Sequence, residues 1–238
     1  MALLSNQTIV ITGASGGIGQ AITQALSEQG AIVCLSGRNQ ELLSEVAARS
    51  EKRGRCYPAD LTVEVELQTA VKAILAENQR INALIHCAAI IKIESVATAS
   101  AEDFDRQFKT NVLAPFRLTQ LLLPSLIEAR GQVVFINSSA GLNAGPNVSQ
   151  YAGTKHALRA FADSLRGECN PSGVRVCSLF LGDTATPMQA AVRRQQGRPY
   201  DPKRVIQPAD VAAVTIAVLS LPRTAEITDV MIRPMVKT

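Results

Sequence analysis

The fold is decided by one stretch near the N-terminus, Thr8-Ile9-Val10-Ile11-Thr12-Gly13-Ala14-Ser15-Gly16-Gly17-Ile18-Gly19. It begins with a short apolar run that is typical of a buried strand and continues into glycines spaced G-x-x-x-G-x-G. A helix is predicted next, ending at Gly30, a usual residue for a helix C-terminus. Its apolar stripe of helical period consists of Ile18, Ala21, Ile22, Ala25 and Leu26.

The rest of the chain repeats this alternation of strand and helix. The predicted strands cover residues 8–12, 31–36, 55–58, 83–87, 132–137, 174–180 and 227–232. Later helices are predicted over residues 41–52, 65–77, 102–129, 150–169 and 209–219. Most strands are almost wholly apolar, as expected for a parallel sheet that is covered on both faces. We therefore predict one Rossmann-like, doubly wound α/β domain over residues 1–238, with a seven-stranded, mainly parallel sheet and helices on both faces.

Composition restricts the class of protein further. The chain has 238 residues, of which 47% are hydrophobic, enough for one core, and no window resembles a membrane span. The net charge is only +4, and 3 Tyr, 6 Phe and no Trp offer few platforms for stacking bases, so nucleic-acid binding is not expected. Five cysteines without a C-x-x-C pair indicate neither a disulfide framework nor a metal site, and a reducing cytoplasm is expected.

The glycine turn favours a bound dinucleotide. Glycine lets the backbone approach a pyrophosphate, and the helix N-terminus contributes a partial positive charge. The stretch lacks the Gly-Lys-Ser/Thr ending of a nucleotide-triphosphate loop. A purely structural glycine turn is the alternative interpretation.

The end of the second strand indicates which dinucleotide is preferred. An acidic residue about 20 positions after the glycines usually binds the ribose 2′-hydroxyl of NAD. Here the sequence is Leu35-Ser36-Gly37-Arg38-Asn39, with a guanidinium and no carboxylate. Because a guanidinium can pair with a 2′-phosphate, we predict that NADP(H) is preferred over NAD(H). Arg38 could instead be an ordinary solvated residue.

A second group of residues carries acid–base chemistry. Tyr151 and Lys155 are four positions apart at the start of a predicted helix, so they share one face, and Ser138 ends a strand thirteen positions earlier. A neighbouring ammonium favours the phenolate form of tyrosine and lowers its pKa. A serine hydroxyl can hydrogen-bond a substrate oxygen that develops negative charge. A Tyr–Lys pair alone could equally be a solvated helix face.

Together these motifs resemble the short-chain dehydrogenase/reductase family over almost the whole chain. Residues 12–19 match the family's T-G-x-x-x-G-x-G turn, and Asp60 matches its adenine-contacting aspartate. The resemblance implies a catalytic tetrad of Asn111, Ser138, Tyr151 and Lys155. In that family the tyrosine exchanges a proton with the substrate, the lysine holds the nicotinamide ribose, and the asparagine holds a water. Ser139 is adjacent, but Ser138 fits the family spacing.

The resemblance also implies the cofactor contacts, which include the segment after the sixth strand that meets the nicotinamide carboxamide. The predicted cofactor-binding residues are Gly13, Ser15, Gly16, Gly17, Ile18, Gly19, Ser36, Arg38, Asp60, Leu61, Cys87, Ala88, Ala89, Tyr151, Lys155, Gly182, Thr184 and Thr186. Two features depart from the family pattern. The family's N-N-A-G is replaced by residues 86–89, His-Cys-Ala-Ala, and its proline before Gly182 is Leu181. His86 is expected to be a hydrogen-bonded core residue.

The substrate is expected to lie between residues 142–150 and 187–200, with residues 183–207 forming a mobile substrate segment. We predict an NADPH-dependent oxidoreductase acting on a ketone or secondary alcohol. The alternatives are 3-oxoacyl-[acyl-carrier-protein] reductase and a non-catalytic NADP(H)-binding sensor or scaffold. Arg193, Arg194 and Arg198 could attract an anionic substrate, although a solvated basic face is favoured. The resemblance implies a homodimer or homotetramer formed through helices 102–129 and 150–169.

Overall fold

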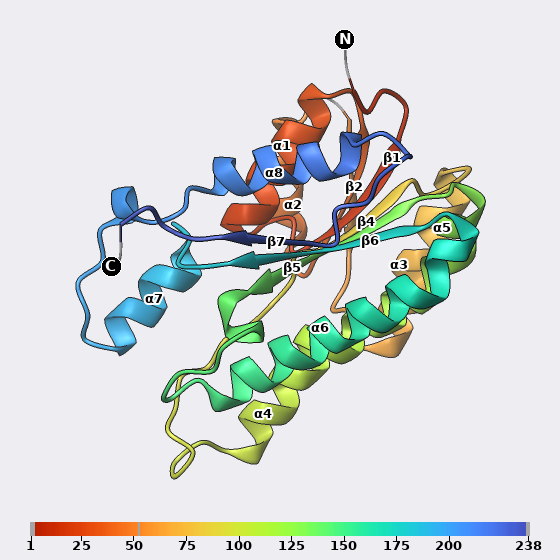
Figure 1. Cartoon of the computed structure of the whole chain (residues 1–238). Helices are drawn as coiled ribbons and strands as arrows, with labels where there is room; N and C mark the ends of the chain where they lie inside the picture. The colour runs from red at the N-terminus through yellow and green to blue at the C-terminus, as the bar shows by residue number, and fades with distance from the viewer. Residues whose placement is uncertain (1–2, 52, 237–238) are drawn as a thin grey trace.

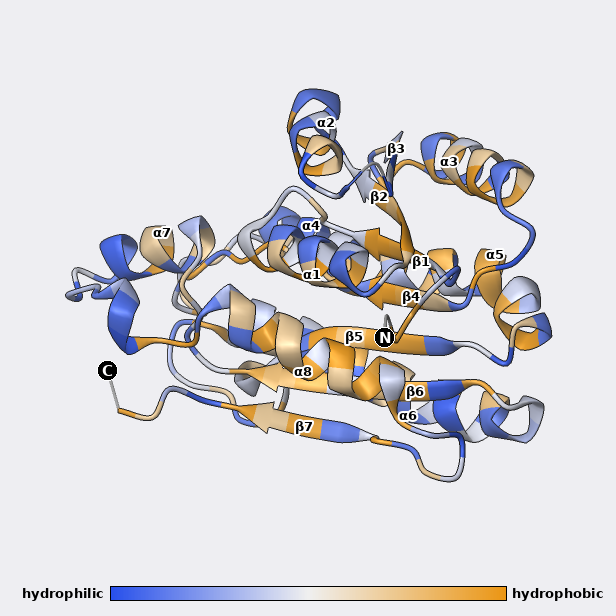
Figure 2. Ribbon diagram, turned by 90° about the horizontal axis from the view of Figure 1, so that it is seen from above, coloured by the Kyte–Doolittle hydropathy of each residue, from blue (hydrophilic) through white to orange (hydrophobic). Residues whose placement is uncertain are grey.

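The computed structural model describes residues 3–51 and 53–236. Across these residues seven strands form a single sheet, in which every neighbouring pair is parallel and the order is β3-β2-β1-β4-β5-β6-β7 (Figure 2). The strands are β1 (Thr8–Thr12), β2 (Ile32–Gly37), β3 (Gly54–Pro58), β4 (Ala83–His86), β5 (Gln132–Ser138), β6 (Arg175–Leu181) and β7 (Asp229–Ile232). The predicted doubly wound α/β fold is confirmed.

Helices cover both faces of this sheet (Figure 1). The longer helices are α1 (Gly17–Glu28), α2 (Gln40–Ala48), α3 (Glu64–Glu77), α4 (Ala101–Phe108), α5 (Ala114–Glu128), α6 (Ser149–Cys169), α7 (Pro187–Gln195) and α8 (Pro208–Ser220). Short helical turns occur at η1 (Lys109–Leu113), η2 (Ser139–Gly141), η3 (Asn170–Ser172) and η4 (Pro202–Arg204).

The core consists of two apolar layers because alternate strand residues face opposite sides of the sheet. One layer packs Ile9 and Ile11 of β1 against α1, α2 and α8. The other packs Val10 of β1 and Phe135 of β5 against α3, α5 and α6. Burial on both faces explains why the central strands are almost continuously apolar, as the colours of β1, β4 and β5 show in Figure 2.

Two predicted elements differ from the structure. The helix predicted over residues 102–129 is divided into α4 and α5 by the π-helical turn η1. The segment 183–207, predicted as a mobile substrate segment and the least regular part of the chain, contains helix α7, whose first turn is capped by the Thr186 hydroxyl accepting from Gln189 N at 3.1 Å. Lys52, the predicted end of the second helix, lies outside the described residues. None of the described helices is long and apolar enough to cross a membrane.

Gly19 offers a direct test of this packing. A Cβ at this position would lie 2.2 Å from the Gly13 carbonyl oxygen, which is backbone and cannot move aside. We expect Gly19→Ala to lower the free energy of unfolding by about 3 kcal/mol or more, as in severe overpacking, measured by urea denaturation. Gly167→Ala is the matched control, since a Cβ there meets open space within α6. It should stabilise the protein by about 0.5–1 kcal/mol. Equal effects of the two changes would contradict this packing.

Candidate active site

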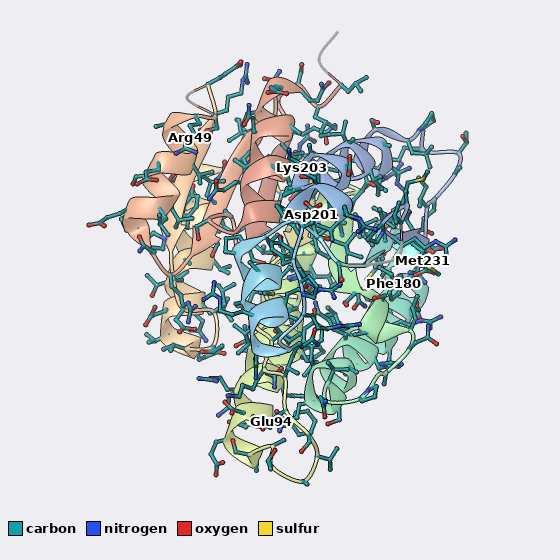
Figure 3. All side chains as sticks on the ribbon, turned by 90° about the vertical axis from the view of Figure 1, so that its left-hand side faces the viewer. Arg49, Glu94, Phe180, Asp201, Lys203 and Met231 are labelled. Atoms are coloured by element: carbon teal, nitrogen blue, oxygen red, sulfur yellow. The ribbon has the colours of Figure 1, made fainter. Side chains whose placement is uncertain are left out.

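A cavity of about 1070 Å³ lies at the carboxyl ends of the strands. Figure 3 looks onto this end of the sheet, with α7 in front of it. Because parallel strands all end at one edge, residues that are distant in sequence meet there. The predicted site residues that line the cavity are Gly13, Ser15, Gly16, Gly17, Ile18, Gly19, Arg38, Asp60, Leu61, Cys87, Ala88, Ala89, Ser138, Tyr151, Lys155, Gly182, Thr184 and Thr186. Ser36 and Asn111 do not line it: Ser36 is buried with its hydroxyl unpaired, and Gly37 lines the cavity instead.

The glycine turn lies directly against the end of β4. Gly13 has φ +64°, and a Cβ there would lie 2.8 Å from both Cα and N of Ala88. Beside it, the Thr12 hydroxyl oxygen accepts hydrogen bonds from the N–H groups of Cys87 and Ala88, both at 3.1 Å. This connection, which sequence reasoning missed, closes the floor of the cavity. Only glycine permits both the left-handed backbone and the close approach.

The geometry of this end of the cavity fits a dinucleotide. The first N–H groups of a helix have no acceptor within it, and those of α1 begin in the cavity wall at Gly17 and Ile18. Gly17 keeps the turn open toward the segment after β6, since a Cβ there would lie 3.3 Å from the Thr186 methyl group. The absence of a side chain at Gly17 therefore leaves the first backbone N–H groups of α1 accessible to an anionic group.

The polar groups near β2 and β3 carry opposite charges. A hydrogen bond from the Thr62 hydroxyl at 2.7 Å is the main cause that lowers the pKa of Asp60, and the nearby Arg38 charge contributes in the same direction. Arg38 also lines the cavity. This end of the cavity, which is predicted to hold the adenosine, thus offers one carboxylate and one guanidinium.

The predicted acid–base group comes together where β5 meets α6. The Ser138 side chain is close enough to Tyr151 to oppose the rise of its pKa, and the Lys155 Nζ atom lies 5.8 Å from the centre of the Tyr151 ring. Lys155 is buried and donates to the Ile136 carbonyl at 3.1 Å. Ser139, the alternative to Ser138, is exposed. The chain therefore places a hydroxyl, a phenol and an ammonium side by side at the cavity wall.

The expected lowering of the tyrosine pKa is not found. Burial raises the pKa of Tyr151 to about 12, against the opposing effect of the Ser138 hydrogen bond. Burial also lowers the pKa of Lys155 to about 8. Loss of water around the phenol outweighs an ammonium that is itself bonded to a backbone carbonyl. In this structure the phenol is therefore protonated at neutral pH.

Asn111 supports the site from behind. Its side chain accepts from Ile90 N at 2.9 Å and donates to the Ile90 carbonyl at 2.9 Å and to Thr154 Oγ1 at 3.1 Å. Asn111 lies within the π-helical turn η1, closed by Ala114 N donating to the Lys109 carbonyl. Pro115, four residues after Asn111, has no N–H, so it cannot make the α-helical bond to the Asn111 carbonyl.

The residues that replace the family's N-N-A-G are all accommodated. His86 is buried, lies 2.8 Å from Thr119 Oγ1 and stacks on Phe135 with ring centres 4.9 Å apart, as its predicted core role requires. Burial lowers the pKa of His86 to about 3, so the ring is neutral. Burial raises the pKa of the Cys87 thiol to about 12, although the nearby Lys155 charge opposes this change. Neither side chain supplies a charge to the cavity.

The wall opposite the sheet differs from the prediction. Helix α7 supplies Met188 and Val192 as expected, but residues 142–150 contribute only Val148. Sequence reasoning missed the segment Ile90–Ile93 and the fully buried Gln107 of α4, whose side chain accepts from Lys92 N at 3.0 Å. An uncharged polar residue on a helix gives no signal in sequence that it will support a neighbouring loop.

Arg193 was also predicted wrongly, as part of a solvated face. It is 5% exposed and forms an ion pair with Asp183, directly after the strand β6 that carries the predicted nicotinamide segment. Backbone bonds from Ile206 N to the Asp183 carbonyl and from Ala185 N to the Ile206 carbonyl, at 3.0 and 2.8 Å, close the base of this loop. The ion pair therefore holds α7 against the base of its own loop.

The fold and the cavity together define the class of protein, a nicotinamide-dependent oxidoreductase. The family model described as short chain dehydrogenase matches residues 7–197. The chain therefore belongs to the short-chain dehydrogenase family, as its motifs predicted. An uncharacterized oxidoreductase of Staphylococcus epidermidis is 28% identical over 236 residues, which cover 99% of this chain and 100% of that protein.

Solved structures show the same architecture. A short chain dehydrogenase of Shigella flexneri complexed with NADP is 27% identical, with a TM-score of 0.87 over 97% of this chain and 98% of that chain. An alcohol dehydrogenase of the archaeon Thermococcus sibiricus complexed with 5-hydroxy-NADP is 24% identical, with a TM-score of 0.89 over 98% and 99% of the two chains. The second similarity concerns the fold alone.

The ion pair at the base of α7 can be tested by local stability. Asp183→Asn should lower the free energy of opening of α7 by about 1–3 kcal/mol, less than for a fully buried pair because the Asp183 side chain is 35% exposed. Hydrogen exchange at the α7 amides measures this value. Arg194→Gln, at the exposed neighbouring position, is the control and should leave exchange unchanged. Equal protection in both variants would refute the anchoring role of the pair.

Proposed function

We propose that this protein is an NADPH-dependent reductase that interconverts a ketone and its secondary alcohol. The observation that carries the proposal is that Ser138, Tyr151 and Lys155 line the same cavity as the glycine turn, with the Lys155 ammonium 5.8 Å from the centre of the Tyr151 ring. A non-catalytic sensor would need the glycine turn but not this phenol. The 3-oxoacyl-[acyl-carrier-protein] reductase alternative uses the same chemistry and differs only in substrate.

The proposed mechanism assigns one task to each polar group. When bound, the reduced nicotinamide supplies a hydride to the carbonyl carbon. Ser138 donates a hydrogen bond to the carbonyl oxygen, and Tyr151 transfers its phenolic proton to that oxygen as negative charge develops. A phenol with a pKa of about 12 before substrate binds is fully protonated and ready to act as the acid. Lys155 stabilises the phenolate that remains, and Asn111 holds the turn behind it.

Cofactor contacts follow from the same cavity. We propose that the N–H groups of Gly17 and Ile18 hold the pyrophosphate, while Asp60 contacts the adenine and Thr186 the carboxamide. Arg38 is assigned to the 2′-phosphate, which gives the preference for NADP(H). No carboxylate lines the cavity on β2 to repel that phosphate, within the described part of the chain.

The proposal further includes assembly and location. Phe104, Phe108 and Phe116 leave 42%, 42% and 44% of their surface exposed on α4 and α5, which favours a homo-oligomer formed through these helices. All five cysteines are free thiols, which is compatible with a reducing cytoplasm.

The acid role of Tyr151 predicts a selective loss of turnover. Tyr151→Phe should reduce kcat for NADPH-dependent ketone reduction by at least about 100-fold, since general acid catalysis typically contributes that much. The Kd for NADPH should stay within about threefold. Absorbance of NADPH with a panel of ketones measures the first quantity, and fluorescence titration measures the second. Tyr57→Phe is the control, because Tyr57 bonds Glu77 and does not line the cavity. Full turnover in Tyr151→Phe would refute the mechanism.

The phosphate role of Arg38 predicts a change in cofactor preference. Arg38→Gln should raise the Kd for NADPH by about tenfold to a hundredfold, as expected for loss of a charged hydrogen bond. The Kd for NADH should change little. Calorimetric titration with both cofactors gives the ratio of the Kd for NADPH to the Kd for NADH. Arg49→Gln, at the residue directly after α2, is the control, because Arg49 pairs with Glu45 outside the cavity. An equal rise in the Kd values for NADPH and NADH would contradict the assignment of Arg38 to the 2′-phosphate.

Lys155 is the predicted contact to the nicotinamide ribose, so its lowered pKa predicts a pH dependence of cofactor binding. The side chain is charged below pH 8 and loses its proton as the pH rises through about 8. The Kd for NADPH should therefore rise above that pH. Cys87 and Tyr151 do not interfere, since burial raises both pKa values to about 12. Lys155→Met should bind more weakly at all pH values without the inflection. An inflection that persists in this variant would assign it to another group.

A further inference from the structure

The substrate half of the cavity carries more positive charge than its walls neutralise. This half lies beyond Tyr151, between the segment Ile90–Ile93, helix α4 with its turn η1, and helix α7. Apolar side chains such as Ile91, Val148 and Val192 cover part of it. Five cations line it as well: Lys92, Arg106, Lys109, Arg193 and Arg198.

Three of these five cations are neutralised by carboxylates close to them. Arg193 pairs with Asp183, as described above. On α4 and η1, the Arg106 guanidinium lies 2.6 Å from an Asp103 oxygen, and the Lys109 ammonium lies 2.7 Å from an Asp105 oxygen. These contacts satisfy the charges locally, so these three side chains are not available to a ligand without loss of an ion pair.

The two other cations, Lys92 and Arg198, are neutralised less closely or not at all. Lys92 lies 3.9 Å from Glu94, at the outer limit of an ion pair between half-exposed side chains. The Arg198 side chain has no ion pair and no hydrogen bond within residues 3–51 and 53–236. Arg198 is exposed, and among these five cations it is the one without a carboxylate partner in the described residues.

These two cations belong to segments that touch. Gln195 of α7 donates to the Ile93 carbonyl at 2.7 Å, which fixes the end of α7 beside the residue that follows Lys92. The chain then turns at Gly197, with φ +63°, and Arg198 N donates to the Arg193 carbonyl at 3.0 Å. Figure 3 shows α7 in front of the strand ends, with Glu94 labelled below it. Both Arg198 and Lys92 line the cavity, on the two segments that this bond joins, and we call the part of the cavity that they line its mouth.

We propose that the substrate is a small oxo acid, whose carboxylate is bound by Arg198 with Lys92 while its ketone lies at Tyr151. This inference rests on the proposed function and names its substrate class. A guanidinium matches a carboxylate with two parallel hydrogen bonds, whereas an ammonium acts as a point charge. A cleft lined by cations in excess also attracts anions from solution. The adenosine end uses a different cation, Arg38, so substrate and cofactor do not compete for one charge.

The test uses matched acids and esters with the complete protein and NADPH. Straight-chain oxo acids with one to six methylene groups between ketone and carboxylate are compared with their methyl esters. At the chain length that fits the cavity, kcat/KM for the acid should exceed that for the ester at least tenfold. Arg198→Gln should reduce this ratio to about one while ester turnover stays within twofold, and Lys92→Gln should reduce it partly. Arg194→Gln, outside the cavity, should keep the full ratio.

Several outcomes would overturn the proposal. One is equal turnover of acids and esters at every chain length, and another is an acid preference that both variants leave intact. A third is that turnover of acetoacetyl-coenzyme A depends on Arg198 while turnover of no oxo acid does. That result would mean that Arg198 and Lys92 bind phosphate groups and not a carboxylate. If no ketone is reduced at all, the proposed function fails. Calorimetric titration of the oxo acids into the NADPH-loaded protein then decides separately: binding that Arg198→Gln weakens tenfold supports the anion site, and no binding refutes it.

Discussion

The contact between the glycine turn and the end of β4 is the constraint on which the site depends. Gly13 lies so close to the Ala88 backbone that a Cβ would be 2.8 Å from it, and the Thr12 hydroxyl holds the N–H groups of two β4-end residues. This contact holds together the ends of β1 and β4, which are neighbours at the centre of the sheet. The cavity lies at these ends, so the glycine turn and the group of Ser138, Tyr151 and Lys155 line one cavity.

Burial of ionisable side chains at this edge of the sheet then sets their protonation states. The same removal of water raises the pKa of Tyr151, lowers that of Lys155 and keeps His86 neutral. A protonated phenol beside an ammonium that can lose its charge near pH 8 suits proton donation to a developing alkoxide. The departures from the family pattern at His86 and Cys87 leave this arrangement intact, because both side chains are uncharged at neutral pH.

Some of this could be predicted from sequence because the relevant signals are local. The apolar strands, the glycine spacing and the four-residue separation of Tyr151 and Lys155 each reflect the geometry of one element. The bonds from the end of β4 to Thr12 and the bond from Gln195 to the Ile93 carbonyl depend on contacts between distant segments, which no local pattern records. The π-helical turn before Pro115 and helix α7 after the Thr186 cap had local signals that the sequence analysis did not use. The pKa of Tyr151 was predicted in the wrong direction because charge proximity is visible in spacing, whereas desolvation requires the packed structure.

The most direct test of the account is a crystal structure of the protein with NADPH. We expect the pyrophosphate on the N–H groups of Gly17 and Ile18, the 2′-phosphate against Arg38, and the nicotinamide between Thr186 and Tyr151. A dinucleotide bound elsewhere, or one whose nicotinamide lies away from Tyr151, would contradict the central claim that one cavity brings hydride donor and proton donor together.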